Sequence, residues 1–177
     1  MSKFVLIDGH SILNRAFYGV PIFTNSEGLH TNAVFGFLNI MFKIIDSKQP
    51  DYMAVAFDVH QPTFRHEMFK DYKGTRKPMM EELREQVPVI KELLQKMNIT
   101  TVELPGYEAD DVIGTLSKEG EKAGMEVDVI SGDRDLLQLA SDHITICIPK
   151  TKKGQTTVEE YNTEGVKELY KVTPTEF

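Results

Sequence analysis

Seven carboxylates in this 177-residue sequence could act together, because each either follows an apolar run or lies at the start of a helical pattern that comes after such a run. They are Asp8, Asp58, Glu108, Asp110, Asp111, Asp133 and Asp135. A single Asp in such a place is commonly only a turn former or a helix N-cap, and acids in the first helical turn are favoured by the helix dipole. Seven at one edge of a sheet would repel one another unless cations were bound among them. The pattern therefore indicates a metal site.

The ligand types indicate which metal and which chemistry. Oxygen ligands without His or Cys favour Mg²⁺ or Mn²⁺. Two such ions about 3.5–4 Å apart can bind a phosphodiester, activate a water and stabilise the leaving oxygen, so no covalent nucleophile is required. Helical spacing puts Glu108 and Asp111 on one face and turns Asp110 away from it, which makes Asp110 the weakest of the three candidates.

A basic and aromatic segment accompanies these acids. Residues 65–77, RHEMFKDYKGTRK, have five Lys or Arg against two acids, a local charge of +3 in a chain of net charge −7. The cations are Arg65, Lys70, Lys73, Arg76 and Lys77, and Phe64, Phe69 and Tyr72 interleave with them. This mixture is typical of a surface that neutralises phosphates and stacks on unpaired bases. We expect Phe64 and Phe69 in the core, because Phe is usually buried, and Tyr72 at the surface.

The elements that would position these residues alternate between strand and helix. Strands are predicted at 4–7, 53–57, 127–130 and 144–148, with a weaker one at 100–104. Helices are predicted at 34–45, 83–97 with a kink or restart at Pro88, 108–122 and 133–140, with a short helical pattern at 166–170. The alternation predicts one α/β domain, a mainly parallel central sheet flanked by helices, whose strands end at one edge.

Several single residues have plainer expected roles. His10 is expected to hydrogen-bond at a strand–helix junction, whereas Asn14 and Arg15 are expected on a solvated helix face. Cys147 is expected in the core. Segment 61–78 is expected to be an exposed loop or lid, and segment 152–154 a hairpin turn.

Composition excludes several classes of protein. The longest apolar stretch, 34–45, includes Asn39 and Lys43 and is shorter than the roughly 20 residues that span a bilayer. No signal-peptide pattern opens the chain, and a lone Cys147 permits no intrachain disulfide, so a cytoplasmic location is expected. The net charge of −7 argues against a nucleic-acid partner until the seven acids are set aside, which leaves zero. The excess acidity can thus be assigned to the metal site.

Six motifs together resemble the 5′ nuclease domain of bacterial DNA polymerase I, in that family's order and spacing over nearly the whole chain. They are FVLIDGH from Phe4, AFD from Ala56, TFRHE from Thr63, YKGTR from Tyr72, PGYEADDV from Pro105 and SGDRD from Ser131. GYEADD and GDRD are highly specific in combination. The resemblance implies a PIN-like fold and cleavage of 5′ flaps and 5′ ends, as in the removal of RNA primers in replication and repair.

The resemblance also implies roles for particular residues. The first metal would be held by Asp8, Asp58, Glu108, Asp110 and Asp111, and the second ion would involve Asp133 and Asp135. Residues 64–88 would form a helical arch or clamp, here called the arch segment, through which a single strand passes. Within it Arg65, Tyr72, Lys73 and Arg76 match positions that grip the scissile phosphate and the unpaired 5′ nucleotides, and Lys73 and Arg76 would be catalytic. Expected partners are flapped DNA, RNA primer–DNA junctions and a polymerase region in a longer polypeptide.

Two other functions remain open at this stage. In the family a further acidic motif, on a helix-turn-helix element that grips duplex DNA, would follow residue 177, so the second possibility is a weakly active or non-catalytic DNA-binding fragment. The third is a phosphoacceptor signalling domain. It predicts an acidic pair after the first strand and a Lys after a late strand. Here Asp8 stands alone, and Ile148 and Pro149 close the late strand, which disfavours that class.

Overall fold

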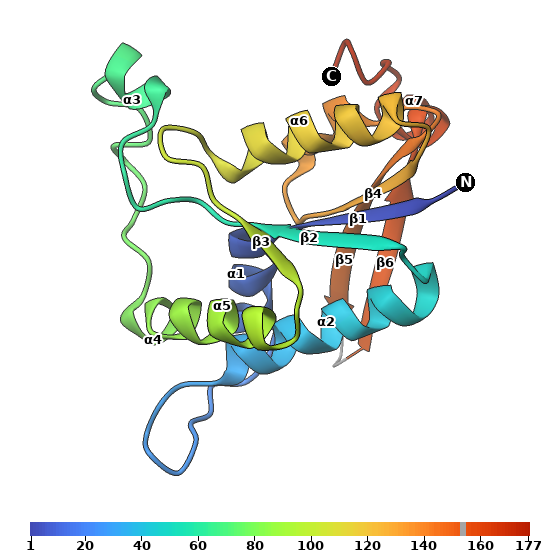
Figure 1. The fold of residues 1–177 in the computed structure, drawn as a ribbon. Helices are drawn as coiled ribbons and strands as arrows, with labels where there is room; N and C mark the ends of the chain where they lie inside the picture. The colour runs from blue at the N-terminus through green and yellow to red at the C-terminus, as the bar shows by residue number, and fades with distance from the viewer. Residues whose placement is uncertain (153–154) are drawn as a thin grey trace.

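Six strands form the central sheet of the computed structural model, which describes residues 1–152 and 155–177 (Figure 1). They are β1 (Lys3–Asp8), β2 (Tyr52–Ala56), β3 (Thr100–Val102), β4 (Glu126–Ile130), β5 (Ile144–Lys152) and β6 (Gln155–Tyr161). Their spatial order is β3-β2-β1-β4-β5-β6, and all neighbours are parallel except β5 and β6. The direction in which the chain adds strands reverses between β1 and β4, the point where open parallel sheets bind their ligands.

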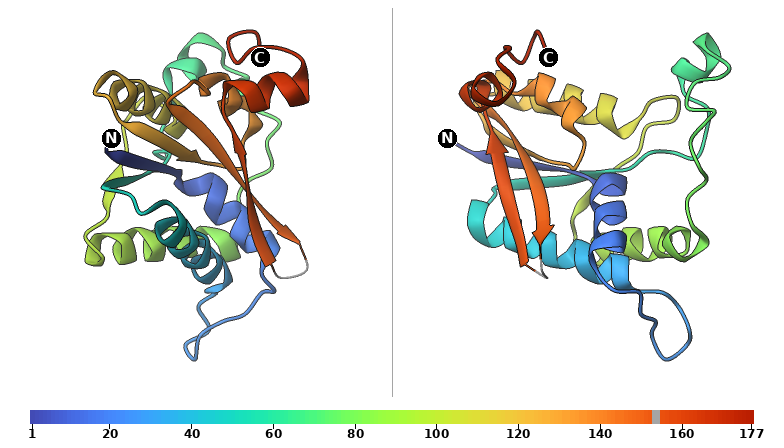
Figure 2. Two further views of the ribbon diagram at one scale, coloured as in Figure 1. Left: turned by 90° about the vertical axis from the view of Figure 1, so that its right-hand side faces the viewer. Right: turned by 180° about the vertical axis from the view of Figure 1, so that it is seen from behind.

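Helices cover both faces of the sheet (Figures 1 and 2). They are α1 (Gly9–Gly19), α2 (Asn32–Lys48), α3 (Phe64–Met68), α4 (Glu81–Arg84), α5 (Gln86–Lys96), α6 (Ala109–Lys122) and α7 (Thr163–Tyr170), with a 3₁₀ helix η1 (Arg134–Leu139). The first two and α5 lie on one face, and α6, η1 and α7 lie on the other. In the part of the chain that is described, no helix is both long and apolar enough to cross a membrane.

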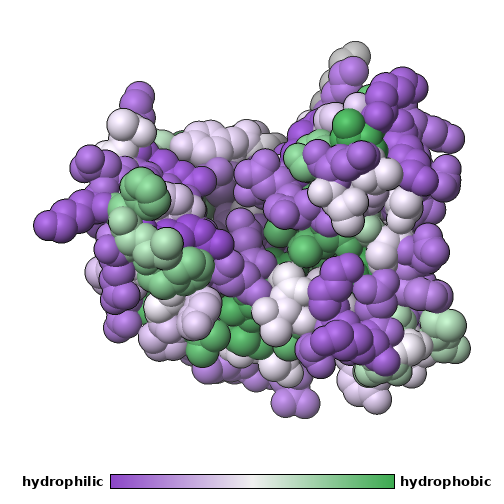
Figure 3. All heavy atoms as spheres, turned by 90° about the horizontal axis from the view of Figure 1, so that it is seen from above, coloured by the Kyte–Doolittle hydropathy of each residue, from purple (hydrophilic) through white to green (hydrophobic). Residues whose placement is uncertain are grey.

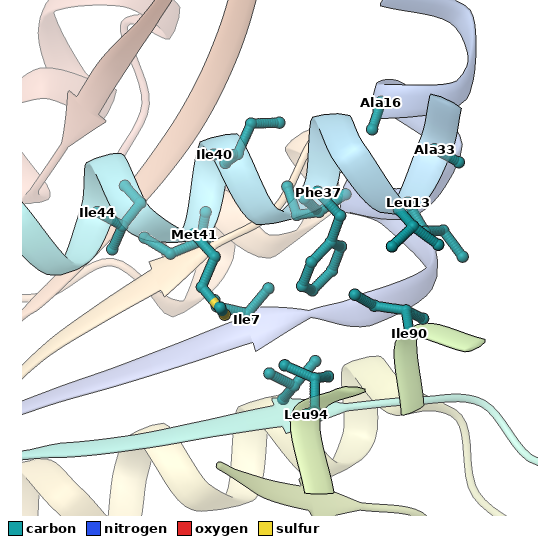
Figure 4. Close-up of a cluster of buried hydrophobic side chains, with 14 of the residues drawn as sticks. Ile7, Leu13, Ala16, Ala33, Phe37, Ile40, Met41, Ile44, Ile90 and Leu94 are labelled. Atoms are coloured by element: carbon teal, nitrogen blue, oxygen red, sulfur yellow. The ribbon is translucent and has the colours of Figure 1, made fainter. Parts of the chain in front are cut away.

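Each face of the sheet has its own apolar core. Successive residues of β1 point to opposite faces, so that Ile7 joins the cluster under α2 and α5 and Leu6 joins the cluster under α6. In the first cluster Phe37, Met41 and Leu94 are fully buried (Figure 4). Burial of each such side chain contributes roughly 1.5–3 kcal/mol of hydrophobic stabilisation. The strand ends at the reversal point are therefore held by packing on both sides.

The predicted α/β class is confirmed, with differences in detail. The restart predicted near Pro88 in the helix at 83–97 is present two residues earlier: α4 ends at Arg84 and α5 begins at Gln86, because Pro88 has no N–H to donate to the carbonyl of Arg84. The helix predicted at 133–140 is a 3₁₀ helix at 134–139. Strand β6 was not predicted. In the expected turn at 152–154, Lys152 is the last residue of β5, and the other two residues lie outside the described part.

Residues 64–80 of the arch segment stand away from the sheet, in front of the edge where the parallel strands end (Figures 1 and 2), whereas Leu83 and Gln86 near the end of the segment are buried. The prediction that Phe64 and Phe69 are core residues is wrong: their side chains are 37% and 72% exposed. Figure 3, the view from above, shows hydrophobic atoms exposed on the side of the molecule where the arch segment lies in Figure 1. Tyr72, expected at the surface, is half-buried because its hydroxyl reaches toward Glu108.

Candidate active site

Asp8 lies at the carboxyl end of β1, beside the point where strand order reverses. Its side chain caps α1 by accepting the N–H of Ser11 at 3.3 Å, and it also accepts the hydroxyl of Ser131 at 2.8 Å. Burial raises the pKa of Asp8 to about 6, and the charges of Asp58 and Asp133 add to the rise. Asp8 is thus a buried carboxylate surrounded by other negative charges.

Ser131, which the sequence analysis did not single out, connects the ends of β1 and β4. Its hydroxyl is fully buried, donates to Asp8 and accepts the N–H of Asp133 at 3.0 Å. Ser11 adds a second link by accepting the N–H of Gly132 at 2.9 Å. In the sequence, this role is indicated by the two small residues between the strand and Asp133, because they permit a tight turn.

Asp58 connects the end of β2 to the start of α6. It accepts the N–H of Ala109, the first residue of α6, at 2.7 Å. Its own N–H donates to Nδ1 of His10 at 3.2 Å, which confirms the hydrogen bond expected of His10 at the strand–helix junction. Gly9 completes this junction, because a Cβ at that position would clash with the ring of Phe57.

Asp110 faces the other acids. Burial raises its pKa to about 7, and the charges of Asp8, Asp133 and Asp58 add to the rise. Helical spacing separated Asp110 from Glu108 and Asp111, and the structure has the same division, with Glu108 as the N-cap of α6. The face that Asp110 occupies is the one toward the acids of the sheet edge, so its rank among the candidate ligands stays a prediction.

Glu108 and Asp111 instead face the arch segment. Arg65 donates from both terminal nitrogens to the two carboxylate oxygens of Asp111, each at 2.7 Å, and these hydrogen bonds lower the pKa of Asp111. Lys73 donates to Glu108 at 2.6 Å, and the Tyr72 hydroxyl donates to the same side chain at 3.4 Å. Two of the predicted metal ligands are thus paired with predicted nucleic-acid contacts.

The remaining predicted site residues are two acids at η1 and three cations of the arch segment. Asp133 is the N-cap of η1 and accepts the N–H of Asp135 at 2.9 Å, and the Asp135 side chain is exposed. Lys70, Arg76 and Lys77 are exposed on the arch segment. The negative charges of Asp58 and Asp133 thus act on both Asp8 and Asp110, and these four acids form the centre of the candidate site.

The chemistry of this donor set fits a hard divalent ion, but its present spacing does not complete a site. All candidate ligands are carboxylates, and the pKa values of Asp8 and Asp110 are raised first by burial and then by neighbouring negative charges, which a cation would offset. Within residues 1–152 and 155–177, however, no three His, Cys, Asp or Glu side chains are arranged to hold an ion. Arg65 and Lys73 occupy two of the carboxylates in this conformation.

Arg15 does not lie where its place in the sequence predicts. It was expected on a solvated face, yet its Nε is buried without a hydrogen-bond partner among the described residues, and burial lowers its pKa. It lines a cavity of about 410 Å³ together with Ser11, Asn14 and Gly132. The spacing of four between Ser11 and Arg15 puts both on one face of α1, which was the available signal.

The fold and the site define an α/β protein with clustered carboxylates at the strand ends and a basic segment above them. The profile of the family described as "5'-3' exonuclease, N-terminal resolvase-like domain" matches residues 3–171, and the chain belongs to this family. This agrees with the resemblance found in the sequence motifs.

The relatives include DNA polymerase I of Bacillus caldotenax and of Bacillus subtilis, each 52% identical over 172 residues. These matches cover 97% of this chain and 19% of each relative. DNA polymerase I of Streptococcus pneumoniae is 42% identical over 179 residues, which is 99% of this chain and 20% of the relative. The chain thus spans about a fifth of the length of the curated relatives it matches.

Solved structures support the fold. The bacteriophage T5 5′-exonuclease, with bound zinc ions, superimposes with a TM-score of 0.72 at 23% identity, over 96% of this chain and 61% of that one. The T5 flap endonuclease in a pseudo-enzyme–product complex with DNA and metal ions gives the same values. At this level of identity the similarity establishes the α/β architecture.

Proposed function

We propose that this chain is a divalent-metal-dependent 5′ nuclease, acting as a 5′-3′ exonuclease and 5′-flap endonuclease on DNA and RNA primers at single-strand–duplex junctions. The observation that carries the proposal is the cluster of Asp8, Asp58, Asp110 and Asp133 at the reversal point of the sheet, beneath a basic segment. Membership of the exonuclease family supports it.

The proposed cofactor is Mg²⁺ or Mn²⁺, as two ions. Asp8, Asp58, Glu108, Asp110 and Asp111 are the proposed ligands of the first, and Asp133 and Asp135 serve the second. When bound, the ions would lower the pKa of an attacking water and stabilise the departing oxygen. Divalent ions in the solved T5 relatives support a divalent metal, and oxygen-only ligands favour Mg²⁺ or Mn²⁺ over zinc.

The chain's own residues position the ligands and the substrate. Ser131 orients Asp8, and Asp58 fixes the start of α6. Lys73 and Arg76 are the proposed contacts of the scissile phosphate. The other nucleic-acid contacts proposed are Arg65, Lys70, Tyr72 and Lys77. Because Arg65 and Lys73 hold Asp111 and Glu108, the arch segment must release these acids before the acids can bind metal and the cations can bind phosphate.

The proposed partners are DNA with a 5′ single-stranded flap and RNA primer–DNA junctions. The T5 complex with DNA supports a DNA substrate, and the similarity to DNA polymerase I supports a linked polymerase region and a cytoplasmic location. We treat residues 1–177 as one catalytic unit of such a protein.

A labelled 5′-flap duplex with Mg²⁺ or Mn²⁺ tests the proposal directly. Cleavage by the chain should be lost in EDTA and fall by at least about 100-fold in Asp110→Ala and in Asp8→Asn, with Asp46→Ala, an exposed acid on α2, as the matched control. Undiminished cleavage in both site variants would refute the assignment. Flap binding without any turnover by the unaltered chain would favour the non-catalytic alternative.

A further inference from the structure

A large cavity opens on the proposed active site from the outer side of α6. Its volume is about 1,150 Å³, above the roughly 300–1,000 Å³ of typical ligand pockets. Glu108 and Asp110 lie in its wall, so whatever occupies it lies next to the proposed metal ligands. The arch segment, the loop before α6, α6 itself and η1 form its sides.

Two exposed aromatic rings project into this cavity from different elements. Phe64 begins α3 and Tyr107 precedes α6, and their ring centroids lie 5.6 Å apart. The N–H of Phe64 donates to the carbonyl of Gly106 at 3.0 Å, which links the two elements. Gly106 has a φ of +86°, a conformation that favours glycine, so the turn that presents Tyr107 is specified locally. The pair is therefore held in place by backbone geometry.

Packing of the apolar cores does not account for the position of these two exposed rings. Phe64 is 37% exposed and Tyr107 48%, and neither ring is part of the two apolar cores. Exposed apolar surface that lines a cavity is more often a binding surface than a by-product of folding. The guanidinium of Arg65 lies 4.5 Å from the centroid of the Phe64 ring, which adds a cation to the same surface.

The rest of the lining indicates what kind of group fits. Leu104, Leu116 and Leu139 make much of the wall apolar, and Glu103 and Glu119 add negative charge. Carboxylates there disfavour a phosphate, whereas a neutral planar group can lie against the aromatic and aliphatic side chains. An unpaired nucleobase has these properties, and it stacks on exposed aromatic rings irrespective of its sequence.

We propose that Phe64 and Tyr107 form a stacking subsite for one unpaired base of the single strand beside the bond that is cut. The inference rests on the proposed function, since the strand is the proposed substrate. The subsite holds the base while its phosphates follow the cations of the arch segment. It therefore distinguishes a strand that carries bases from one that lacks a base at this position.

The test uses the whole chain and a 5′-flap duplex with 2-aminopurine at successive positions of the flap, in Ca²⁺. Binding is followed by anisotropy and stacking by quenching of 2-aminopurine. We expect quenching at one position, with loss of quenching and roughly 5- to 100-fold weaker binding in Phe64→Leu and in Tyr107→Leu. Tyr107→Phe keeps the ring and should retain both signals. Phe69→Leu is the matched control, because Phe69 is exposed on the arch segment but does not line the cavity.

A substrate with an abasic residue at the quenched position separates stacking from a general effect on folding. Removing the base should weaken binding by the unaltered chain but cause little further loss in Phe64→Leu, because the same contact is already absent. Equal quenching and affinity in the Leu variants and the unaltered chain would overturn the subsite while leaving a cleaving enzyme. Failure of the unaltered chain to bind or cleave any flap would overturn the proposed function and the subsite together.

Discussion

Two carboxylates that are adjacent in the sequence have pKa values shifted in opposite directions in this protein. Burial and surrounding acids raise the pKa of Asp110 to about 7, whereas hydrogen bonds from Arg65 lower the pKa of the next residue, Asp111. The difference arises because consecutive residues at a helix start point in different directions, one toward the acids of the sheet edge and one toward the arch segment. In the metal-free protein, charge repulsion is therefore concentrated on the inner acids.

Asp110→Asn should stabilise the metal-free protein at high pH. Asp110 has a folded pKa of about 7, above its ordinary 3.8, so its contribution to stability is complete below pH 4 and is lost as pH rises through 7. The Asn variant lacks this loss, so in EDTA at pH 8 its free energy of unfolding should exceed that of the unaltered chain by about 1–3 kcal/mol, allowing for partial exposure. Urea denaturation at pH 4, 6 and 8 measures this, with Asp46→Asn as control. If Asp110→Asn is less stable than the unaltered chain at pH 8, the pKa of Asp110 is not raised in the folded protein.

At the scale of elements, the sequence was most informative where burial follows a regular pattern along the element. The strands at 4–7 and 127–130 and the helix at 108–122 were predictable, because apolar runs and helical periodicity record burial directly. Strand β6 was missed, because its sequence, QTTVEEY, is largely polar and the strand lies at the edge of the sheet. The core placement of Phe69 failed because average burial says nothing about a segment with no partner surface.

The candidate site likewise has one part that the sequence predicts and one part that it does not. That the acids of β1, β2 and β4 meet at one edge follows from parallel strands and was predictable. Which acids would pair with the arch segment was not, because the position of an irregular segment depends on tertiary contacts rather than on a repeating pattern. The pairing of Arg65 with Asp111 could therefore be found only in the structure.

The arch segment and divalent ions should compete for Glu108 and Asp111. In Arg65→Ala/Lys73→Ala both acids are free, so Mn²⁺ should bind about 5- to 30-fold more tightly than to the unaltered chain, as expected for loss of ion pairs worth about 1–2 kcal/mol in total. In the unaltered chain, Mn²⁺ should accelerate backbone hydrogen exchange in residues 69–78, whereas in the double variant exchange should be fast already. Calorimetry and exchange measured by mass spectrometry test both effects.

The control for this competition is Lys70→Ala, which removes an exposed cation of the same segment outside the Glu108 and Asp111 ion pairs. Its Mn²⁺ affinity and exchange should match the unaltered chain. If Mn²⁺ slows exchange in residues 69–78 of the unaltered chain, metal and arch segment cooperate rather than compete, and the predicted release is wrong.

At the scale of the whole molecule, the net charge of −7 conceals a separation of charge. The acids are concentrated at the reversal point of the sheet, and the segment in front of them is basic. Two divalent ions at the site add four positive charges and change the net charge to −3. Because the field near a site is set by nearby charges and bound ions, the global charge does not decide whether DNA can approach.

Binding of a flapped duplex should therefore depend on divalent ions even when no cleavage occurs. In EDTA the clustered acids repel phosphates and hold Arg65 and Lys73, so we expect weak binding. In Ca²⁺ at equal ionic strength the affinity should rise by at least about 10-fold.

The logarithm of the affinity for the flapped duplex should fall linearly with the logarithm of salt concentration. Lys77→Ala should reduce this slope by roughly 0.7 if Lys77 neutralises one single-strand phosphate. Lys96→Ala, a cation paired with Glu92 at the end of α5, should leave the slope unchanged. Anisotropy titrations at several salt concentrations measure these quantities, and equal affinity in EDTA and Ca²⁺ would mean that the carboxylate cluster does not control the approach of DNA.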